Sequence, residues 1–305
     1  INFNSGLAWL CMKQVNPNFL IIASNVKEKR IFKNKFINKK NIRIIMQQKS
    51  GFMNACFEGS KYVKTKFCTF LYDDDELSPY STKIFKRVFD ENLALGHGLV
   101  TNTYNRIKFM PISIKKISYK TILLGYFGKK INGVKFMPVS PICLVFETSF
   151  LQKWQYIITK FCKNNKLRTD LIINQNIGPD LMLYLHQVIK KNMISFSTPH
   201  IARFVTHNSS MSYILGKNKL RIGYWLAKKS LIDFNKIKDK RLNNYIFTFL
   251  TLSGIQILII NFYLNIFNKQ NYFKPFMIEL NNLKKNKNFS FSFICLIKII
   301  FYRFF

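Results

Sequence analysis

The stretch KSGFMNACFEGSKYVKTKFCTFLYDDDELSP, residues 49–79, joins a helical pattern, an apolar strand and an acidic run. Gly51 opens the helical pattern, which ends near residue 63. The continuous apolar run at residues 66–72 is typical of a strand that is buried on both faces of a sheet. Four consecutive acids follow at residues 73–76. Because ligands of open α/β sheets bind at the carboxyl ends of strands, this run is the first candidate site.

Strands and helices also alternate upstream of this stretch. The apolar runs at residues 19–23 and 41–46 predict two further strands. Residues 7–15 predict a short helix, and residues 27–40 a basic loop. Strands that alternate with helices at this spacing predict an α/β domain with a mostly parallel sheet.

Downstream, a second acid stands at the start of a predicted helix. Gly178 and Pro179 mark the beginning of this helix, and Asp180 lies in its first turn. An Asp at such a position commonly accepts hydrogen bonds from free backbone N–H groups, which is the structural interpretation of Asp180. The other predicted elements are helices at 81–91 and 149–164 and strands at 134–146 and 201–206.

The composition predicts a folded, strongly basic chain. Its 305 residues include 48 Lys and Arg against 14 Asp and Glu, which gives a net charge of +34. A disordered polycation would be poor in aromatic residues, whereas this chain has 31 Phe and 14 Tyr. A nucleic-acid-binding protein is one alternative, but the basic residues are spread along the chain in no recognisable module. Because the abundance of Lys, Asn, Ile and Phe also resembles compositional drift, we expect no nucleic-acid partner.

The few acidic residues are more informative about function than the many Lys and Arg residues. Adjacent carboxylates raise one another's pKa unless a cation compensates, and together with phosphate oxygens and water they suit Mg²⁺ or Mn²⁺. A solvated acidic turn is the alternative. His207, in the loop HNSSMSY, is a third candidate, although a lone His in such a loop is commonly only a polar surface residue. The six cysteines lack the spacing of a zinc site and predict reduced thiols.

Taken together, three motifs resemble the family-2 glycosyltransferases. Residues 49–79 are similar to the family's segment in which a glycine-opened helix leads to a buried strand and an Asp-rich metal motif. GPDLMLYL, residues 178–185, is similar to its helix-opening acidic motif. HIARFVTHNSSMS, residues 200–212, is similar to its His-Xaa-Xaa-Ser-Xaa-Ser closing element. Order and spacing fit over about residues 5–230, three quarters of the chain.

The resemblance implies a GT-A fold, which is Rossmann-like with a mostly parallel sheet flanked by helices, over residues 1–230. A nucleotide-sugar half would comprise about residues 1–80, and an acceptor half about residues 81–230. The implied reaction transfers a sugar from a nucleotide diphosphate, with a UDP-sugar expected, to a hydroxyl of a glycan or lipid-linked glycan. Such transfer is usually inverting and metal-dependent, and it belongs to polysaccharide biosynthesis.

The resemblance also implies roles for individual residues. Asp180 would be the general base that takes the proton of the acceptor hydroxyl. The implied ligands are Asn25, Gly51, Asp73 and Asp74 for the nucleotide sugar, and Asp73, Asp75 and His207 for Mn²⁺ or Mg²⁺. Which two of the three Asp residues bind the metal stays open, because Tyr72 replaces the first acid of the family's pattern. A catalytically inactive relative is the second alternative, because Ala23-Ser24-Asn25 stands where the family has acids that contact the nucleoside.

Residues 231–305 predict a basic and apolar helical tail that associates with a membrane. Residues 245–267 carry no charge and are long enough to span a bilayer, but the polar side chains among them favour an amphipathic or buried helix pair. The basic flanks and the terminal FICLIKIIFYRFF suit the anionic inner leaflet. We therefore expect a cytoplasmic protein, peripheral on the inner face of the cell membrane. The chain begins with Ile and without a secretory signal, so we expect an incomplete N-terminus.

Overall fold

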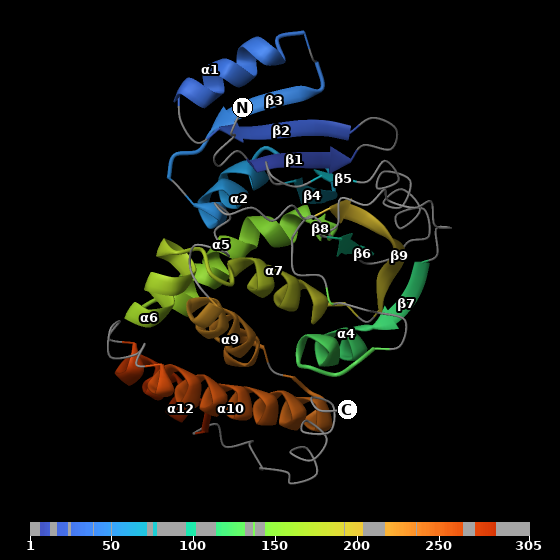
Figure 1. Cartoon of the computed structure of the whole chain (residues 1–305). Helices are drawn as coiled ribbons and strands as arrows, with labels where there is room; N and C mark the ends of the chain where they lie inside the picture. The colour runs from blue at the N-terminus through green and yellow to red at the C-terminus, as the bar shows by residue number, and fades with distance from the viewer. Residues whose placement is uncertain are drawn as a thin grey trace. The chain divides into compact units, whose positions relative to one another are not determined.

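The chain is a mixed α/β protein (Figure 1). The computed structural model describes residues 7–12, 17–23, 26–38, 40–49, 51–71, 76–77, 96–101, 114–131, 137, 144–191, 193–203, 217–235, 237–264 and 272–284. The chain divides into two compact units. Unit 1 comprises Ile1–Tyr119, Phe136–Thr159 and Lys190–His207, and unit 2 comprises Lys120–Lys135, Lys160–Ile189 and Asn208–Phe305. The domain boundary expected at residue 230 stays a prediction.

The larger sheet of unit 1 has the strand order β3-β2-β1-β4-β8. Its strands are β1 (Leu7–Met12), β2 (Pro17–Ala23), β3 (Ile42–Met46), β4 (Phe67–Leu71) and β8 (Phe146–Glu147). β1 is antiparallel to both β2 and β4, β2 is parallel to β3, and β8 is antiparallel to β4. The expected mostly parallel sheet is therefore not seen among the described strands. Parallel pairing of β1 with β2 would need a long crossover, and the chain between Met12 and Pro17 is too short for one.

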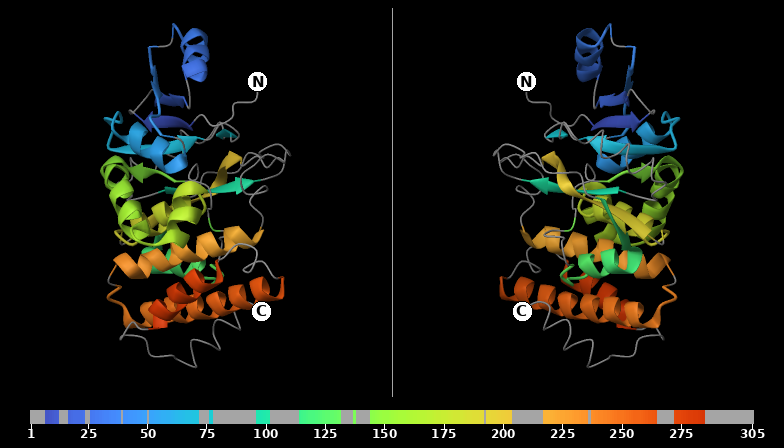
Figure 2. Two further views of the ribbon diagram at one scale, coloured as in Figure 1. Left: turned by 90° about the vertical axis from the view of Figure 1, so that its left-hand side faces the viewer. Right: turned by 90° about the vertical axis from the view of Figure 1, so that its right-hand side faces the viewer.

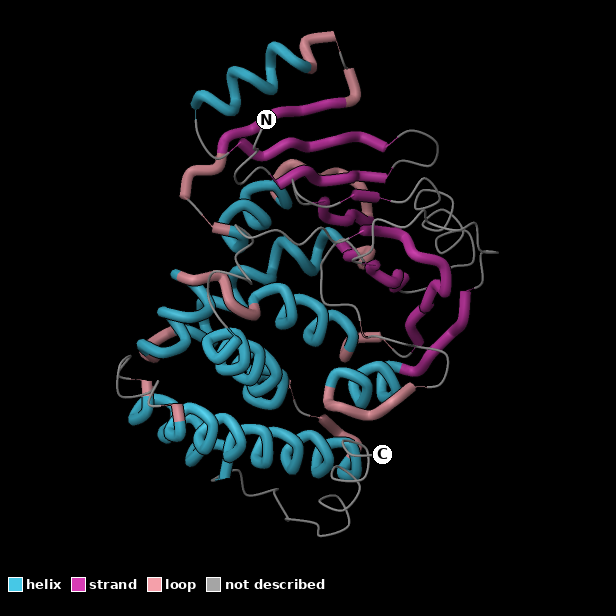
Figure 3. The backbone as a smooth tube through the Cα atoms, in the orientation of Figure 1, coloured by secondary structure: helices cyan, strands magenta, loops and turns pink. Residues whose placement is uncertain are grey.

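Even so, β2, β3 and β4 all run in one direction. β2 and β4 share a direction because each is antiparallel to β1, and β3 is parallel to β2. Two helices make the crossovers between these strands, α1 (Val26–Lys35) from β2 to β3 and α2 (Phe52–Ser60) from β3 to β4 (Figure 3). The predicted strands at 19–23, 41–46 and 66–72 and the helix that follows Gly51 are thus confirmed.

Two predictions for the first 40 residues are wrong. Residues 7–12 form β1 instead of a helix, because hydrogen bonds to two neighbouring strands outweigh a weak local preference. The expected basic loop at 27–40 is largely α1. In α1 only Phe32 is buried, so hydrophobic periodicity gave little signal for this helix.

The smaller sheet of unit 1 is centred on β9 (Met193–Arg203). It pairs antiparallel with β5 (Glu76–Leu77) and β7 (Ile114–Ser118) and parallel with β6 (Gly96–Thr101). The strand expected at 201–206 corresponds to the end of β9. The helix expected at 81–91 lies outside the described residues, as does most of the strand expected at 134–146.

Aromatic side chains connect the larger sheet of unit 1 to its helices. Phe70 of β4 makes an edge-to-face contact with Phe146 of β8, with 5.1 Å between ring centroids. Phe52 of α2 packs against both Phe70 and Trp154 of α5 (Thr148–Cys162). Because Phe70, Phe146 and Trp154 are fully buried, this cluster holds β4 and the start of α2 in place.

Unit 2 is helical. Its described elements are α4 (Tyr119–Tyr126), α6 (Lys166–Arg168), the π-helix η2 (Thr169–Asn174), α7 (Pro179–Val188), α9 (Lys217–Phe234), α10 (Lys240–Tyr263) and α12 (Phe273–Lys284). α9 packs against both α7 and α10, and α10 packs against α12 (Figure 2). α7 is confirmed as the helix that Pro179 opens. All its residues except Asp180 are buried, so it is the central helix of this unit.

Part of the expected tail belongs to the core of unit 2. The indole Nε1 of Trp225 donates a hydrogen bond of 2.8 Å to the carbonyl of Leu250 on α10. A Cβ atom at Gly254 would lie 2.8 Å from Leu280 of α12, so α10 and α12 approach closely there. Within the described residues, α10 is the helix long and apolar enough to cross a membrane, but 56% of its most apolar 18-residue segment is buried.

Candidate functional site

Of the residues that the sequence singles out, Gly51 and Asp180 are described. Gly51 belongs to unit 1 and Asp180 to unit 2. The remaining candidates, Asn25, Asp73, Asp74, Asp75 and His207, lie outside the described residues. Their roles therefore stay predictions, and the local geometry of unit 1 and of unit 2 is considered separately.

Gly51 occupies a backbone conformation that favours glycine. Its φ of 104° and ψ of 151° are strained for any residue with a Cβ atom. Its carbonyl accepts the first hydrogen bond of α2, from the backbone N–H of Ala55 at 3.0 Å. The requirement for glycine here is thus explained by the turn into α2, and nucleotide binding by Gly51 stays a prediction.

The co-directional strands of unit 1 place three carboxyl ends at one edge of the larger sheet. β2 ends at Ala23, β3 at Met46 and β4 at Leu71. In the sequence, Asn25 follows the end of β2 by two residues, and Asp73 follows the end of β4 by two residues. Such an edge is where open α/β sheets bind ligands.

In unit 2, a tight turn leads the chain into α7. Asn176 and Gly178 both have left-handed backbone conformations, with φ of 52° and 90°. A Cβ atom on Gly178 would lie 2.8 Å from the carbonyl oxygen of Gly223 on α9, and one on Gly223 would lie 2.2 Å from Ile177. The missing side chains of the two glycines therefore allow the start of α7 to pack directly on α9.

Asp180 follows this turn and is the half-buried acid of α7. Its Oδ1 accepts a hydrogen bond of 2.8 Å from the backbone N–H of Leu181. Burial raises the pKa of its carboxyl group to about 7, and the hydrogen bonds from the backbone offset only part of this rise. Within the described residues, no ion pair to Asp180 is present. A carboxyl group with a pKa near 7 can accept and release a proton at neutral pH.

Tyr224 of α9 is the neighbour that sequence reasoning missed. The negative charge of Asp180, together with burial, raises the pKa of the Tyr224 phenol well above its usual value. The phenol is therefore neutral at physiological pH. No pattern in the sequence marks Tyr224, since its proximity to Asp180 depends on how α7 packs on α9 through Gly178 and Gly223.

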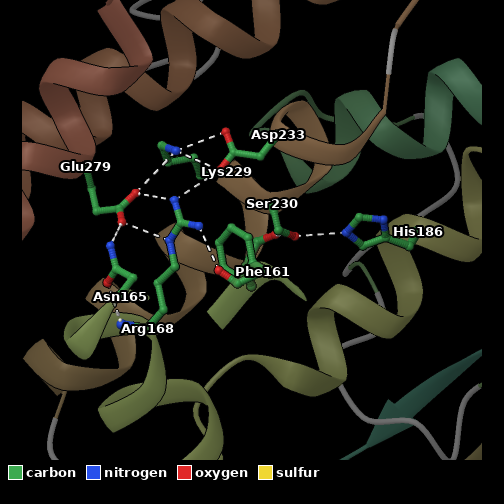
Figure 4. A network of polar contacts seen from close by, with 9 residues as sticks. Phe161, Asn165, Arg168, His186, Lys229, Ser230, Asp233 and Glu279 are labelled. Carbon is green, nitrogen blue, oxygen red and sulfur yellow. Dashed lines mark hydrogen bonds and ion pairs between the residues drawn. The ribbon is translucent and has the colours of Figure 1, made fainter. Parts of the chain in front are cut away.

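A second group of charged side chains in unit 2 has a different character (Figure 4). Glu279 of α12 is fully buried, and Arg168 donates to its two carboxylate oxygens at 2.8 and 2.7 Å. Lys229 lies 3.2 Å from the same carboxylate and 2.7 Å from Asp233, and Asn165 also donates to Glu279. Burial alone would raise the pKa of Glu279, but the bonds from Arg168 and the charge of Lys229 outweigh it and lower this pKa. This network binds three helical segments together.

His186 and Ser230 form a buried pair that resembles a catalytic base and nucleophile. The imidazole Nε2 lies 2.9 Å from the Ser230 hydroxyl, which donates its proton to the carbonyl of Ala227 at 2.6 Å. The Nδ1 atom accepts from the amide of Asn235 at 3.1 Å, so Nε2 carries the proton and donates to Ser230. To activate Ser230 as a nucleophile, Nε2 would have to accept the proton of the hydroxyl group instead of donating one to it. We therefore assign this pair a structural role.

Within the described residues, no group of three or more His, Cys, Asp and Glu side chains could hold a metal ion. The acidic run and His207 lie outside that part of the chain. The sequence matches no protein-family model and no curated protein sequence. The likeness to the family-2 glycosyltransferases therefore rests on the three sequence motifs.

Proposed function

We propose that the protein is a glycosyltransferase of GT-A fold that transfers a sugar from a nucleotide diphosphate to an acceptor hydroxyl. The observation that carries this proposal is Asp180, a half-buried carboxyl group at a helix start whose pKa is about 7. The resemblance to the family-2 glycosyltransferases implies that this same residue is the general base. Structural ion pairs also perturb pKa values, but Asp180 has no ion pair within the described residues.

The donor side of the proposal is supported by the larger sheet of unit 1. Asn25 follows β2 and Asp73 follows β4, and these two strands run in the same direction. Hard carboxylate oxygens next to a diphosphate fit Mg²⁺ or Mn²⁺. Two of the three residues Asp73, Asp74 and Asp75 would hold the ion, with His207 near it or the diphosphate. The ion would supply positive charge against the leaving diphosphate.

The proposed reaction needs one proton acceptor. The acceptor hydroxyl oxygen forms a bond to the anomeric carbon, the bond from that carbon to the nucleotide diphosphate breaks, and the hydroxyl proton passes to Asp180. With a pKa of about 7, roughly half of Asp180 is ionised at neutral pH. The neutral phenol of Tyr224 beside it adds no charge that would lower its basicity.

Thermal shift measurements with nucleotides test this proposal directly. UDP and UDP-sugars should raise the melting temperature of the full chain in the presence of Mn²⁺ or Mg²⁺, because a ligand of the folded state stabilises it. The Asp73→Asn/Asp75→Asn variant should lose the metal-dependent part of this shift. Incubation of the wild type with a UDP-sugar and metal should also release UDP slowly by hydrolysis.

The alternatives predict other outcomes of the same measurements. A catalytically inactive relative would bind the nucleotide but show neither transfer nor hydrolysis. A nucleic-acid-binding protein would bind oligonucleotides tightly at moderate salt and show no shift with any nucleotide sugar. We propose a glycan or lipid-linked glycan precursor at the inner face of the membrane as the acceptor.

A further inference from the structure

The outer side of α10 carries a stripe of exposed apolar side chains. Ile255, Ile259 and Phe262 follow one another at helical spacing with exposed fractions of 39%, 64% and 72%, and Tyr263 is 87% exposed. These four residues are referred to below as the outer stripe. The opposite side of α10 is also apolar and is buried in unit 2. A helix that is apolar on both sides is typical of a protein core or of contact with lipid.

The solvent-facing charges of α10 and α12 are all positive within the described residues. α10 contains no acid, and the acid of α12, Glu279, is fully buried against Arg168 and Lys229. Exposed basic residues are present on both helices: Lys240, Arg241 and Lys274. Asp239, which precedes α10, is paired with Lys120. The two helices lie side by side, as Figures 1 and 2 show.

We propose that the outer stripe inserts into the surface of an anionic membrane, with the basic residues of α10 and α12 among the lipid headgroups. The outer stripe lies in the C-terminal half of α10, and the exposed basic residues lie near the starts of α10 and α12. Such a combination of apolar and basic side chains, without an exposed acid on the described parts of the two helices, is complementary to anionic lipid. A second copy of this chain is a poor occupant, because two molecules of net charge +34 repel each other. This proposal is independent of the glycosyltransferase activity.

The packing of α10 also sets the mode of contact. Leu250, Ile257 and Asn261 are buried on the inner side, and Leu250 accepts the hydrogen bond from Trp225. To span a bilayer, α10 would have to leave these contacts. The helix therefore lies in the plane of the membrane surface with only the outer stripe in contact with acyl chains.

Vesicle sedimentation with the full chain tests the proposal without any sugar donor. The vesicles are phosphatidylcholine alone, or phosphatidylcholine with about 30% phosphatidylglycerol. The wild type should sediment with the anionic vesicles. The double variant Ile259→Glu/Phe262→Glu should bind them about tenfold more weakly, or not at all. The matched control is Val26→Glu/Ile37→Glu, which changes two apolar residues of unit 1 that are 70% and 77% exposed. It should bind like the wild type.

Three results would overturn the proposal. They are equal binding by both double variants, equal binding of the wild type to neutral and anionic vesicles, and no binding at low salt. A wild-type dimer that the Ile259→Glu/Phe262→Glu variant dissociates, measured by light scattering without vesicles, would instead assign the outer stripe to self-association. An unchanged melting temperature and circular dichroism spectrum of the variants excludes unfolding as the cause of lost binding.

Discussion

Two acids of unit 2, Glu279 and Asp180, have pKa values that are shifted in opposite directions. Glu279 is fully buried, yet its pKa lies below the usual value, because Arg168 and Lys229 compensate its charge. Asp180 is only half-buried, yet burial raises its pKa to about 7, because the hydrogen bonds from backbone N–H groups offset only part of this rise. Burial raises both pKa values, and the presence or absence of cations decides the net direction.

In the proposed function, this difference separates a structural acid, Glu279, from the general base, Asp180. Glu279 stays ionised at all physiological pH values and connects α12 to α6 and α9. With a pKa of about 7, Asp180 can gain or lose a proton near neutral pH, and its ionised form destabilises the fold relative to its neutral form. If the comparison is correct, replacement of Glu279 harms the fold, whereas replacement of Asp180 harms only the reaction.

The largest expected effect is on catalysis. Asp180→Asn should lower the rate of sugar transfer about 10²- to 10⁴-fold, because an amide cannot accept the acceptor proton. Its affinity for the donor should change little, as measured by thermal shift with a UDP-sugar. Asp170→Asn, at an acid of η2 in the same unit, serves as the matched control and should retain full activity. An unchanged rate in Asp180→Asn would remove this residue from the mechanism.

The next effect is on stability, at the other acid. Glu279→Gln should lower the free energy of unfolding by about 3 to 5 kcal/mol, because Arg168 and Lys229 would remain without their buried counter-charge. Urea denaturation measures this loss. Asp233→Asn, at a carboxylate that is 27% exposed, should cost only about 1 kcal/mol. Because the pKa of Glu279 is lowered by folding, the stability it contributes should decline as the pH falls below the pKa of an unfolded Glu.

Asp180→Asn should change the free energy of unfolding in the opposite direction, as measured by the same urea denaturation. A carboxyl group whose pKa rises on folding binds more protons in the folded state, so its ionisation destabilises the fold as the pH rises from about 4 to 8. The variant should therefore be more stable than the wild type by about 1 to 3 kcal/mol near pH 8, and about equally stable near pH 4. A variant that is less stable at every pH would identify Asp180 as a structural cap.

The smallest effect is expected at an acid near the surface. Asp239 caps α10 by accepting hydrogen bonds from the backbone N–H groups of Arg241 and Leu242, and hydrogen bonding to Lys120 lowers its pKa first of all. Asp239→Ala should cost about 1 kcal/mol in thermal or urea unfolding. Lys120→Met should cost less, because an exposed ion pair adds little. A loss as large as that of Glu279→Gln would mean that burial does not explain the difference between these acids.

Much of the local structure could be predicted because it is encoded by nearby residues. The strand from 66 to 72 follows from an apolar run, and α7 from a glycine, a proline and an apolar stripe. The helix α1 was missed because it buries only Phe32, and β1 because its conformation depends on pairing with β2 and β4. For β1, the pairing with β4 joins segments that are distant in the sequence, so no local pattern marks it.

The sequence by itself determined that Asp180 stands in the first turn of a helix and that the acidic run follows a buried strand. These are local facts, set by helix capping and hydrophobic runs. Only the tertiary structure decided that Tyr224 neighbours Asp180 and that Glu279 is neutralised by Arg168. It also decided that α10 is buried on one side and apolar on the other. The pKa of a side chain and the exposure of a helix face depend on which side chains, distant in the sequence, lie next to them. Only the packing of the folded chain brings those side chains together.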